Sequence, residues 1–236
     1  MIPNQRVEID ETVKRWFTAY ETCLEMMVDR NMTSTEERYT LESFALELFQ
    51  RISSGANIEQ HFIPFRSAAG DVNLLGMFTY DLSKSMSAAV VDFVNGYAPE
   101  VMRVSAVIVA LDIKAGDATR ALRHVIAPSI HPRSEQQIRR PWIDFFYLTE
   151  LQNNTLKHCL QPEYSFLPAE EHANLRINLT RCLQGKQKEH TLYDLLPKIL
   201  QTDIVVRWYG AQVGDIFIVQ RLQATVYRIV VPPLIE

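Results

Sequence analysis

The sequence predicts a mixed α/β protein of two domains, residues 1–151 and 152–236. Apolar residues recur at helical spacing in the first 50 residues, and short β-branched and aromatic runs replace them from about residue 58. Near residue 152 the character changes again, and the chain closes on two strand-like runs. With 236 residues, 47% of them hydrophobic, the chain can form one large or two small domains with hydrophobic cores.

The first 50 residues predict two helices. The first is expected over residues 13–27, with Asp10 as N-cap and a left-handed Asn31 at its end. Its apolar stripe consists of Val13, Trp16, Phe17, Tyr20, Leu24 and Met27. Ser34 and Glu37 have the spacing of a capping box, which predicts the start of the second helix. That helix is expected to bury Leu41, Phe44, Ala45, Leu48 and Phe49.

Strands are expected in the next hundred residues. The runs that predict them are 61–65, 72–80, 101–113 and 143–151, with a helix near 117–126. The run from Ala106 to Leu111 is apolar on both faces, which is typical of a central strand covered by helices.

A small β module is predicted at the end of the chain. Gly210 and Gly214 are two of only 8 glycines, so each is expected to mark a backbone position that a side chain would obstruct. Residues 215–221 and 225–231 then predict a β-hairpin. Its strands are apolar on both faces, so each face needs a cover, either from this chain alone or from a partner chain.

Composition narrows the classes of function. A formal net charge of −4 argues against a free-standing nucleic-acid binder, because affinity for DNA comes largely from Lys and Arg at phosphates. The three cysteines, Cys23, Cys159 and Cys182, form no C-x-x-C pair and predict free thiols in a reducing compartment. No run approaches the ~20 apolar residues of a spanning helix, and the N-terminus lacks the order of a secretion signal, so no membrane partner is expected.

The run from Asp203 to Arg221, closing on Tyr227-Arg228, resembles the C-terminal signature of the fifth shared subunit of eukaryotic nuclear RNA polymerases. That family's C-terminal module has a counterpart in archaeal RNA polymerase. Leu160-Gln-Pro162, with the acidic pair Glu170-Glu171 after it, is similar to the family's linker into this module. Residues 196–199 are similar to the lead into its final β segment. The resemblance covers nearly the whole chain and is strongest after residue 160.

The resemblance implies both fold and function. The fold would be an N-terminal mixed-sheet jaw domain, similar to an inactive restriction nuclease, plus a small C-terminal α+β assembly domain that contains the hairpin. The function would be that of a non-catalytic, cofactor-free subunit of DNA-directed RNA polymerase in the nucleus, docked on the largest subunit among other polymerase subunits. The docking residues that it implies are Asp203, Arg207, Tyr209, Gly210, Gly214, Arg221, Tyr227 and Arg228.

The chain also departs from the family pattern in its most similar region. Ile204 stands where the family has Pro, Gln212-Val213 replaces a basic pair, Tyr164 replaces a His, and the hairpin tip is shorter. Losing the basic pair removes charge-assisted hydrogen bonds to a partner. These departures predict a divergent paralogue, which would be nucleolar if it serves polymerase I.

A local basic patch lies between residues 118 and 142. This segment contains five arginines and a single acidic residue, Glu135, in a chain that is acidic as a whole. The segment Pro128-Ser129-Ile130-His131-Pro132 resembles the part of the jaw domain that lies along downstream duplex DNA. The patch therefore predicts weak, sequence-independent phosphate contacts, unless it is only a solvated surface. The candidates are Arg120, Arg123, Arg133, Arg139 and Arg140.

Three other interpretations are open at this stage. Asp112 and Lys114, with Asp81 or Asp92 upstream, have residue types that hold Mg²⁺ in nucleases, although any strand leaving a core can end in charges. A set of His and Cys residues has zinc-ligand atom types without the spacing of a known finger, so no metal is assigned. Its members are His158, Cys159, Cys182 and His190. A scaffold protein unrelated to transcription would use the hairpin for other partners.

Overall fold

The mixed α/β class is confirmed by a computed structural model, which describes residues 10–34, 36–79, 84–97, 104–110, 142–182 and 191–232. The chain divides into two compact units, Met1–Asn153 and Asn154–Glu236. Each has its own mixed sheet. The predicted helix near 117–126, the nuclease candidates Asp81, Asp112 and Lys114, and all five candidate DNA-contact arginines lie outside the described residues.

The N-terminal unit is built on a five-stranded sheet of order β1-β2-β3-β4-β5. The first two pairings are antiparallel and the last two parallel. The strands are β1 (Met32–Thr33), β2 (Phe62–Ser67), β3 (Val72–Phe78), β4 (Val104–Ala110) and β5 (Trp142–Tyr147). A 3-10 turn at Ile58–His61 precedes β2, and two more follow β5 at Leu148–Leu151 and Thr155–Lys157.

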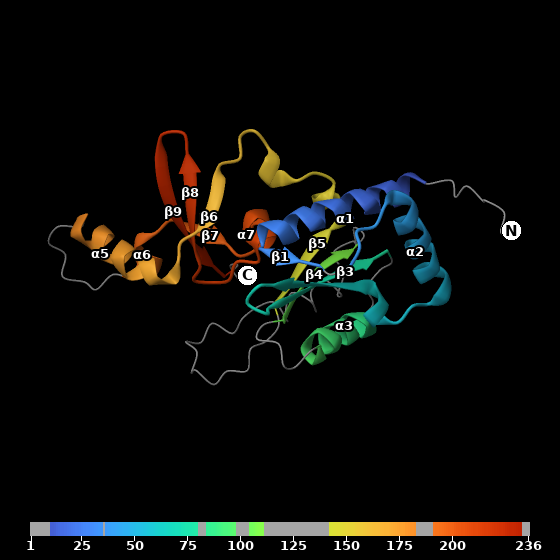
Figure 1. Ribbon diagram of the computed structural model, residues 1–236. Helices are drawn as coiled ribbons and strands as arrows, with labels where there is room; N and C mark the ends of the chain where they lie inside the picture. The colour runs from blue at the N-terminus through green and yellow to red at the C-terminus, as the bar shows by residue number, and fades with distance from the viewer. Residues whose placement is uncertain are drawn as a thin grey trace. The chain divides into compact units, whose positions relative to one another are not determined.

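Helices cover both faces of this sheet. They are α1 (Glu11–Asp29), α2 (Leu41–Ser54) and α3 (Lys84–Gly96). Figure 1 shows α1 along one face and α3 against the opposite face. Val90 and Val94 of α3 pack on Leu74 and Ile108 of the central strands. Residues 106–110 of β4 are fully buried between β3 and β5, so the prediction of a covered central strand is confirmed.

The start of the second helix was predicted wrongly. Ser34 does not cap a helix; its hydroxyl accepts a hydrogen bond from the Glu36 amide. The helix begins at Leu41, where Thr40 and Ser43 form a reciprocal capping box. Two of the predictions for α1 hold, since Asp10 is its N-cap and Asn31 adopts a left-handed φ of 56°.

The buried face of α2 was also predicted in part wrongly. Phe44, Ala45 and Leu48 are buried as expected, but Phe49 is 60% exposed. Leu46 and Ile52 are exposed beside it, so α2 turns an apolar stripe outward. Helical periodicity identified apolar positions without showing which of two apolar arcs packs against the rest of the unit.

One buried ion pair joins α1 to β5. Arg30, the C-cap residue of α1, donates from a terminal guanidinium nitrogen to Oδ2 of Asp144 at 2.8 Å. The two side chains are only 5% and 2% exposed. Cys23, which is also on α1, is fully buried. Burial raises the pKa of its thiol to about 12, so Cys23 stays protonated. The pair therefore fixes the end of α1 against the sheet edge in a nearly dry environment.

His61 is expected to make stability depend on pH. It is buried at the start of β2 and stacks on Phe78 with ring centroids 4.9 Å apart. Burial, and then the positive charge of Arg51, lower the pKa of His61 below its ordinary value. The unfolded chain thus binds a proton that the folded chain resists, so stability is fully present above about pH 6.5 and falls as the pH drops below that value.

Denaturant unfolding between pH 5 and pH 7.5 tests this prediction. The stability of His61→Phe should vary less with pH across the range than that of wild type, because Phe can keep the ring contact without titrating. The exposed His158 provides the matched control, and His158→Gln should follow wild type. Equal pH slopes for His61→Phe and wild type would contradict the prediction.

Candidate functional site

The C-terminal unit, which contains the predicted docking residues, is built on a four-stranded sheet of order β6-β8-β9-β7. The strands are β6 (Glu163–Phe166), β7 (Lys198–Leu200), β8 (Ile216–Arg221) and β9 (Ala224–Val231). β6 and β8 are antiparallel, β8 and β9 form the predicted hairpin, and β7 runs parallel to β9. A 3-10 turn at Ala169–Glu171 leads into α5 (His172–Cys182), and α6 (Leu192–Leu195) and α7 (Ile204–Tyr209) complete the unit.

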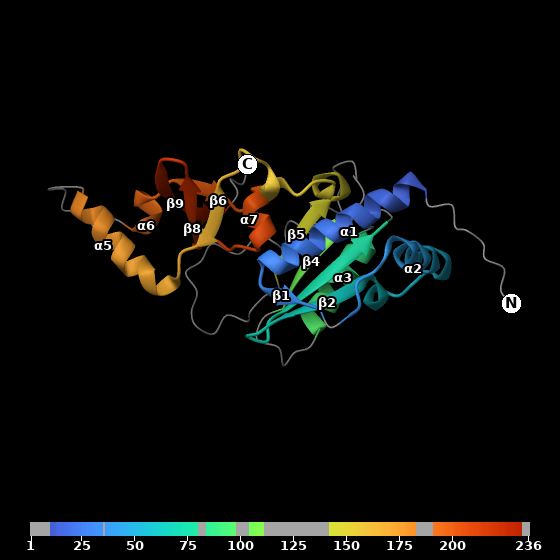
Figure 2. The same cartoon turned by 45° about the horizontal axis from the view of Figure 1, so that its top comes forward.

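Both faces of the hairpin are covered by this chain at its base. Figure 2 shows α7 on one side of the sheet and α5 and α6 on the other. On the α7 side, Val206 packs with Phe217 and Val219. On the other side, Leu175 of α5 and Leu192 of α6 pack around Ile216. The alternative of a hairpin covered by its own chain is thus correct for the base of the hairpin.

The tip of the hairpin is different. Residues 220–225 are all exposed, and Leu222 at the turn is fully exposed at 107%. Figure 1 shows this end of the hairpin extending beyond the helices of the unit. Leu160, in the loop before β6, is 83% exposed. Within the described part of the C-terminal unit, the tip of the hairpin is therefore more open to a partner than its base.

The stretch from Asp203 to Gly210 is a short helix with a cap at each end. The Asp203 carboxylate accepts a hydrogen bond from the Val205 amide at 2.9 Å, which defines the N-cap of α7. Gly210 ends the helix with φ 63° and ψ 29°, in the left-handed region. Its amide bonds to the Arg207 carbonyl, and the Ala211 amide bonds to Val206. Gly210 is thus a helix cap, and not part of a turn that enters the hairpin.

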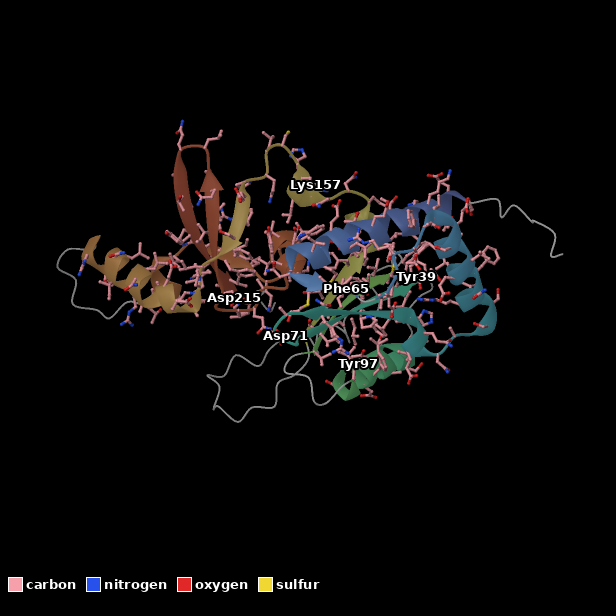
Figure 3. The ribbon with its side chains drawn as sticks, in the orientation of Figure 1. Tyr39, Phe65, Asp71, Tyr97, Lys157 and Asp215 are labelled. Carbon is pink, nitrogen blue, oxygen red and sulfur yellow. The ribbon has the colours of Figure 1, made fainter. Side chains whose placement is uncertain are left out.

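Gly214 is the glycine next to the hairpin. Its φ is 98°, and its amide donates to the Val230 carbonyl at 3.0 Å. The following Asp215, labelled in Figure 3, accepts the Gln212 amide at 2.7 Å. These contacts fix the turn from α7 into β8.

Tyr209 belongs to an aromatic cluster that joins α7 to β6 and β8. Its hydroxyl donates to the Tyr164 carbonyl at 3.3 Å. Its ring lies 5.8 Å from Phe166 and 5.7 Å from Phe217, and Phe166 stacks on Phe217 at 4.9 Å. Tyr209 was predicted from the sequence, whereas Phe166, which is 43% exposed at the sheet edge, was not. The alternation of Tyr164 and Phe166 before a proline was the signal for this edge strand.

The remaining predicted residues lie around the same sheet in different settings. Arg207 is half-buried on α7 and donates from Nε to the Thr202 carbonyl at 3.2 Å. Tyr227 lies on the α5 side of the sheet, opposite Ile218. Arg228 lies directly opposite Phe217 on the α7 side, and Arg221 is exposed at the end of β8. The structure therefore gathers most of the predicted residues on the α7 side, and Tyr227 on the other.

The N-terminal unit has a cavity of about 180 Å³ that was not predicted from the sequence. Leu24 of α1 and Phe65 of β2 line it, and Glu36, Glu37 and Tyr39 come from the segment before α2. Tyr39 and Phe65 are labelled in Figure 3. The Tyr39 amide donates to the Tyr20 hydroxyl at 3.3 Å, and burial raises the pKa of Tyr20.

The described residues offer no grouping of three or more His, Cys, Asp or Glu side chains that could hold a metal ion. Among the His and Cys residues considered as zinc ligands, His190 and the side chain of Cys182 lie outside the part of the chain that the structure describes. None of the helices within the described ranges is both long and apolar enough to cross a membrane.

The C-terminal unit is similar in sequence to a known family. Residues 153–231 match the family model described as RNA polymerase Rpb5, C-terminal domain. The chain is also 24% identical over 215 residues to DNA-directed RNA polymerase V subunit 5A of Arabidopsis thaliana, covering 86% of this chain and 90% of that protein. Together with the mixed α/β fold, these similarities support an Rpb5-like RNA polymerase subunit. Subunits of this type are non-catalytic components of the polymerase.

Proposed function

We propose that this chain docks on the largest subunit of a nuclear RNA polymerase through its C-terminal unit. The observation that carries the proposal is the position of the family match, since residues 153–231 include every predicted docking residue. In this unit Arg221 and the hairpin tip are exposed, while the base of the hairpin is closed by α5, α6 and α7. An exposed tip on a well-packed base suits a rigid contact with another chain.

The N-terminal unit is proposed to be the jaw domain. It would lie near downstream double-stranded DNA and contact phosphates weakly through the basic patch of residues 118–142. The chain as a whole has a net charge of −4, so it is not expected to bind DNA by itself. The Arg-rich segment therefore suits a DNA contact that is held in place by the rest of the polymerase. We further propose that the protein is nuclear, and nucleolar if it serves polymerase I.

Purification through a tag on the full-length chain tests the docking proposal. The largest polymerase subunit should co-purify at a constant ratio through successive columns, together with other polymerase subunits, and mass spectrometry should identify them. Recovery of the chain without any polymerase subunit would contradict the proposal.

Replacing Arg133, Arg139 and Arg140 by Ala should leave assembly intact and weaken the grip of the polymerase on downstream DNA. Each lost phosphate contact should reduce the slope of log affinity against log salt by roughly one unit. Arg176 and Arg181, exposed on α5, allow a control variant that also loses positive charge, and it should leave the slope unchanged. An unchanged slope in the triple variant would mean that the patch is only solvated.

A further inference from the structure

Two arginines lie on one face of the β8–β9 hairpin, along a line toward its tip. The register pairs Phe217 with Arg228, Val219 with Val226, and Arg221 with Ala224. Alternate residues of a strand share a face, so these three pairs form successive rows on the same face. Arg228 lies in the first row and Arg221 in the third. The Val219–Val226 row separates them.

This face is the α7 side of the sheet, and α7 leaves its outer part open. Val226 and Tyr164 pack against the core around Phe217 but stay half-exposed. Ala224 and Arg221, one row further toward the tip, are exposed. The two arginines thus bracket a row that is apolar and partly accessible.

The Arg228 guanidinium has no acceptor in the described part of the chain. Its Nε is buried and makes no hydrogen bond there, and neither Arg228 nor Arg221 belongs to an ion pair among the described residues. The acid that shares this face, Asp215, is engaged by the Gln212 amide. A buried donor without an acceptor is costly, so the arrangement favours an acceptor supplied from outside.

We propose that an acidic, extended segment of a partner polypeptide lies across this face. The inference rests on the proposed docking function and gives the chemistry of its partner. The planar guanidinium fork matches a carboxylate in two parallel hydrogen bonds. Arg228 and Arg221 lie two row steps apart, with the Val219–Val226 row between them. Two steps are four residues, or about 13 Å along the strands at about 3.3 Å per residue. An extended segment of the pattern acid, any residue, apolar, any residue, acid fits that distance, with its apolar side chain on Val226.

A polypeptide suits this face better than a nucleic acid does. The affinity of a protein for a nucleic-acid backbone grows with the number of phosphates that it neutralises. Among the described residues, this face of the hairpin offers only two cations, and an apolar row separates them. An aliphatic side chain between two carboxylates would bury the Val226 row and pair both arginines.

Zero-length crosslinking to lysine variants tests the inference. Full-length Arg228→Lys and Arg221→Lys are purified with the polymerase and treated with a carbodiimide, which joins an amine to a carboxylate that touches it. Both variants should give amide links to Asp or Glu residues of one short segment in a polymerase subunit, found by mass spectrometry. Gln220→Lys is the matched control, because Gln220 is exposed beside Arg221 with its side chain on the opposite face. It should give no link to that segment.

Charge reversal provides a second readout. The complex of Arg228→Glu with the polymerase should dissociate about 30-fold faster or more, as expected when one member of a buried charge pair is lost. If the polymerase subunits stay bound but neither lysine variant forms a link to a carboxylate, the inference is overturned. The docking proposal would then still stand. Binding that nuclease treatment abolishes would point to a phosphate ligand and would also overturn the inference. A wild-type chain that retains no polymerase subunit would overturn the docking proposal, and the inference with it.

Discussion

Replacing Asp144 by Ala should lower the free energy of unfolding of the N-terminal unit by about 3–5 kcal/mol. The substitution removes the carboxylate that Arg30 contacts at 2.8 Å and leaves a guanidinium that is only 5% exposed. Desolvation of the remaining charge, more than the loss of attraction, sets the size of the effect. Chemical denaturation of the full-length chain, followed by a probe in the N-terminal unit, measures it.

Two controls separate this effect from a general loss of contacts. Asp92→Ala removes an exposed carboxylate from α3 and should change stability by less than about 0.5 kcal/mol. The double variant Arg30→Met with Asp144→Leu should recover much of the loss, because it replaces both charges by apolar groups. A single Asp144→Ala variant as stable as wild type would show that the pair is solvated in solution.

Gly210→Val should destabilise the C-terminal unit by roughly 1–3 kcal/mol and release the chain from the polymerase. Gly210 has φ 63°, a conformation that places a Cβ close to the following carbonyl and that β-branched residues rarely adopt. Loss of the cap should loosen α7, and with it the contact of Tyr209 with Phe217. Hydrogen exchange of the full-length chain should report faster opening of α7 and β8.

Gly210→Asn is the matched variant, because Asn tolerates the left-handed conformation better than any other residue with a side chain. It should keep both the slow exchange and the co-purifying polymerase. If Gly210→Val behaves like Gly210→Asn in both measurements, α7 does not position the docking surface.

The hairpin was predictable because its signal is local. β-branched and aromatic residues fill both strands, and the short link between them leaves few alternative registers, so β8 (Ile216–Arg221) and β9 (Ala224–Val231) follow the prediction closely. The covered strand β4 was predictable for a similar reason, since a run that is apolar on both faces needs two covers.

Other elements depend on contacts that a local pattern does not contain. The Ile-Val-Val run at the start of α7 favours a strand, yet the caps at Asp203 and Gly210 and the packing of Val206 make it helical. Helix α3 was missed in the sequence; in the structure its Val90 and Val94 pack on the sheet. The outward Phe49 of α2 shows that periodicity identifies apolar positions and leaves their partners open.

The candidate site was predictable in residue type and less so in role. Asp203 and Gly210 were expected at a partner surface, and in the structure each caps α7. Arg221 and Arg228 were expected among the docking residues, and strand register adds that they share one face. That relation depends on the exact register of β8 against β9, which the short link restricts and the structure defines.

An electron cryomicroscopy map of the polymerase purified through a tag on this chain tests the central claim most directly. The account predicts density for residues 154–236 against the largest subunit, with the hairpin tip and Arg228 buried in the contact. A map in which the C-terminal unit faces solvent while the N-terminal unit makes the contact with the largest subunit would contradict it.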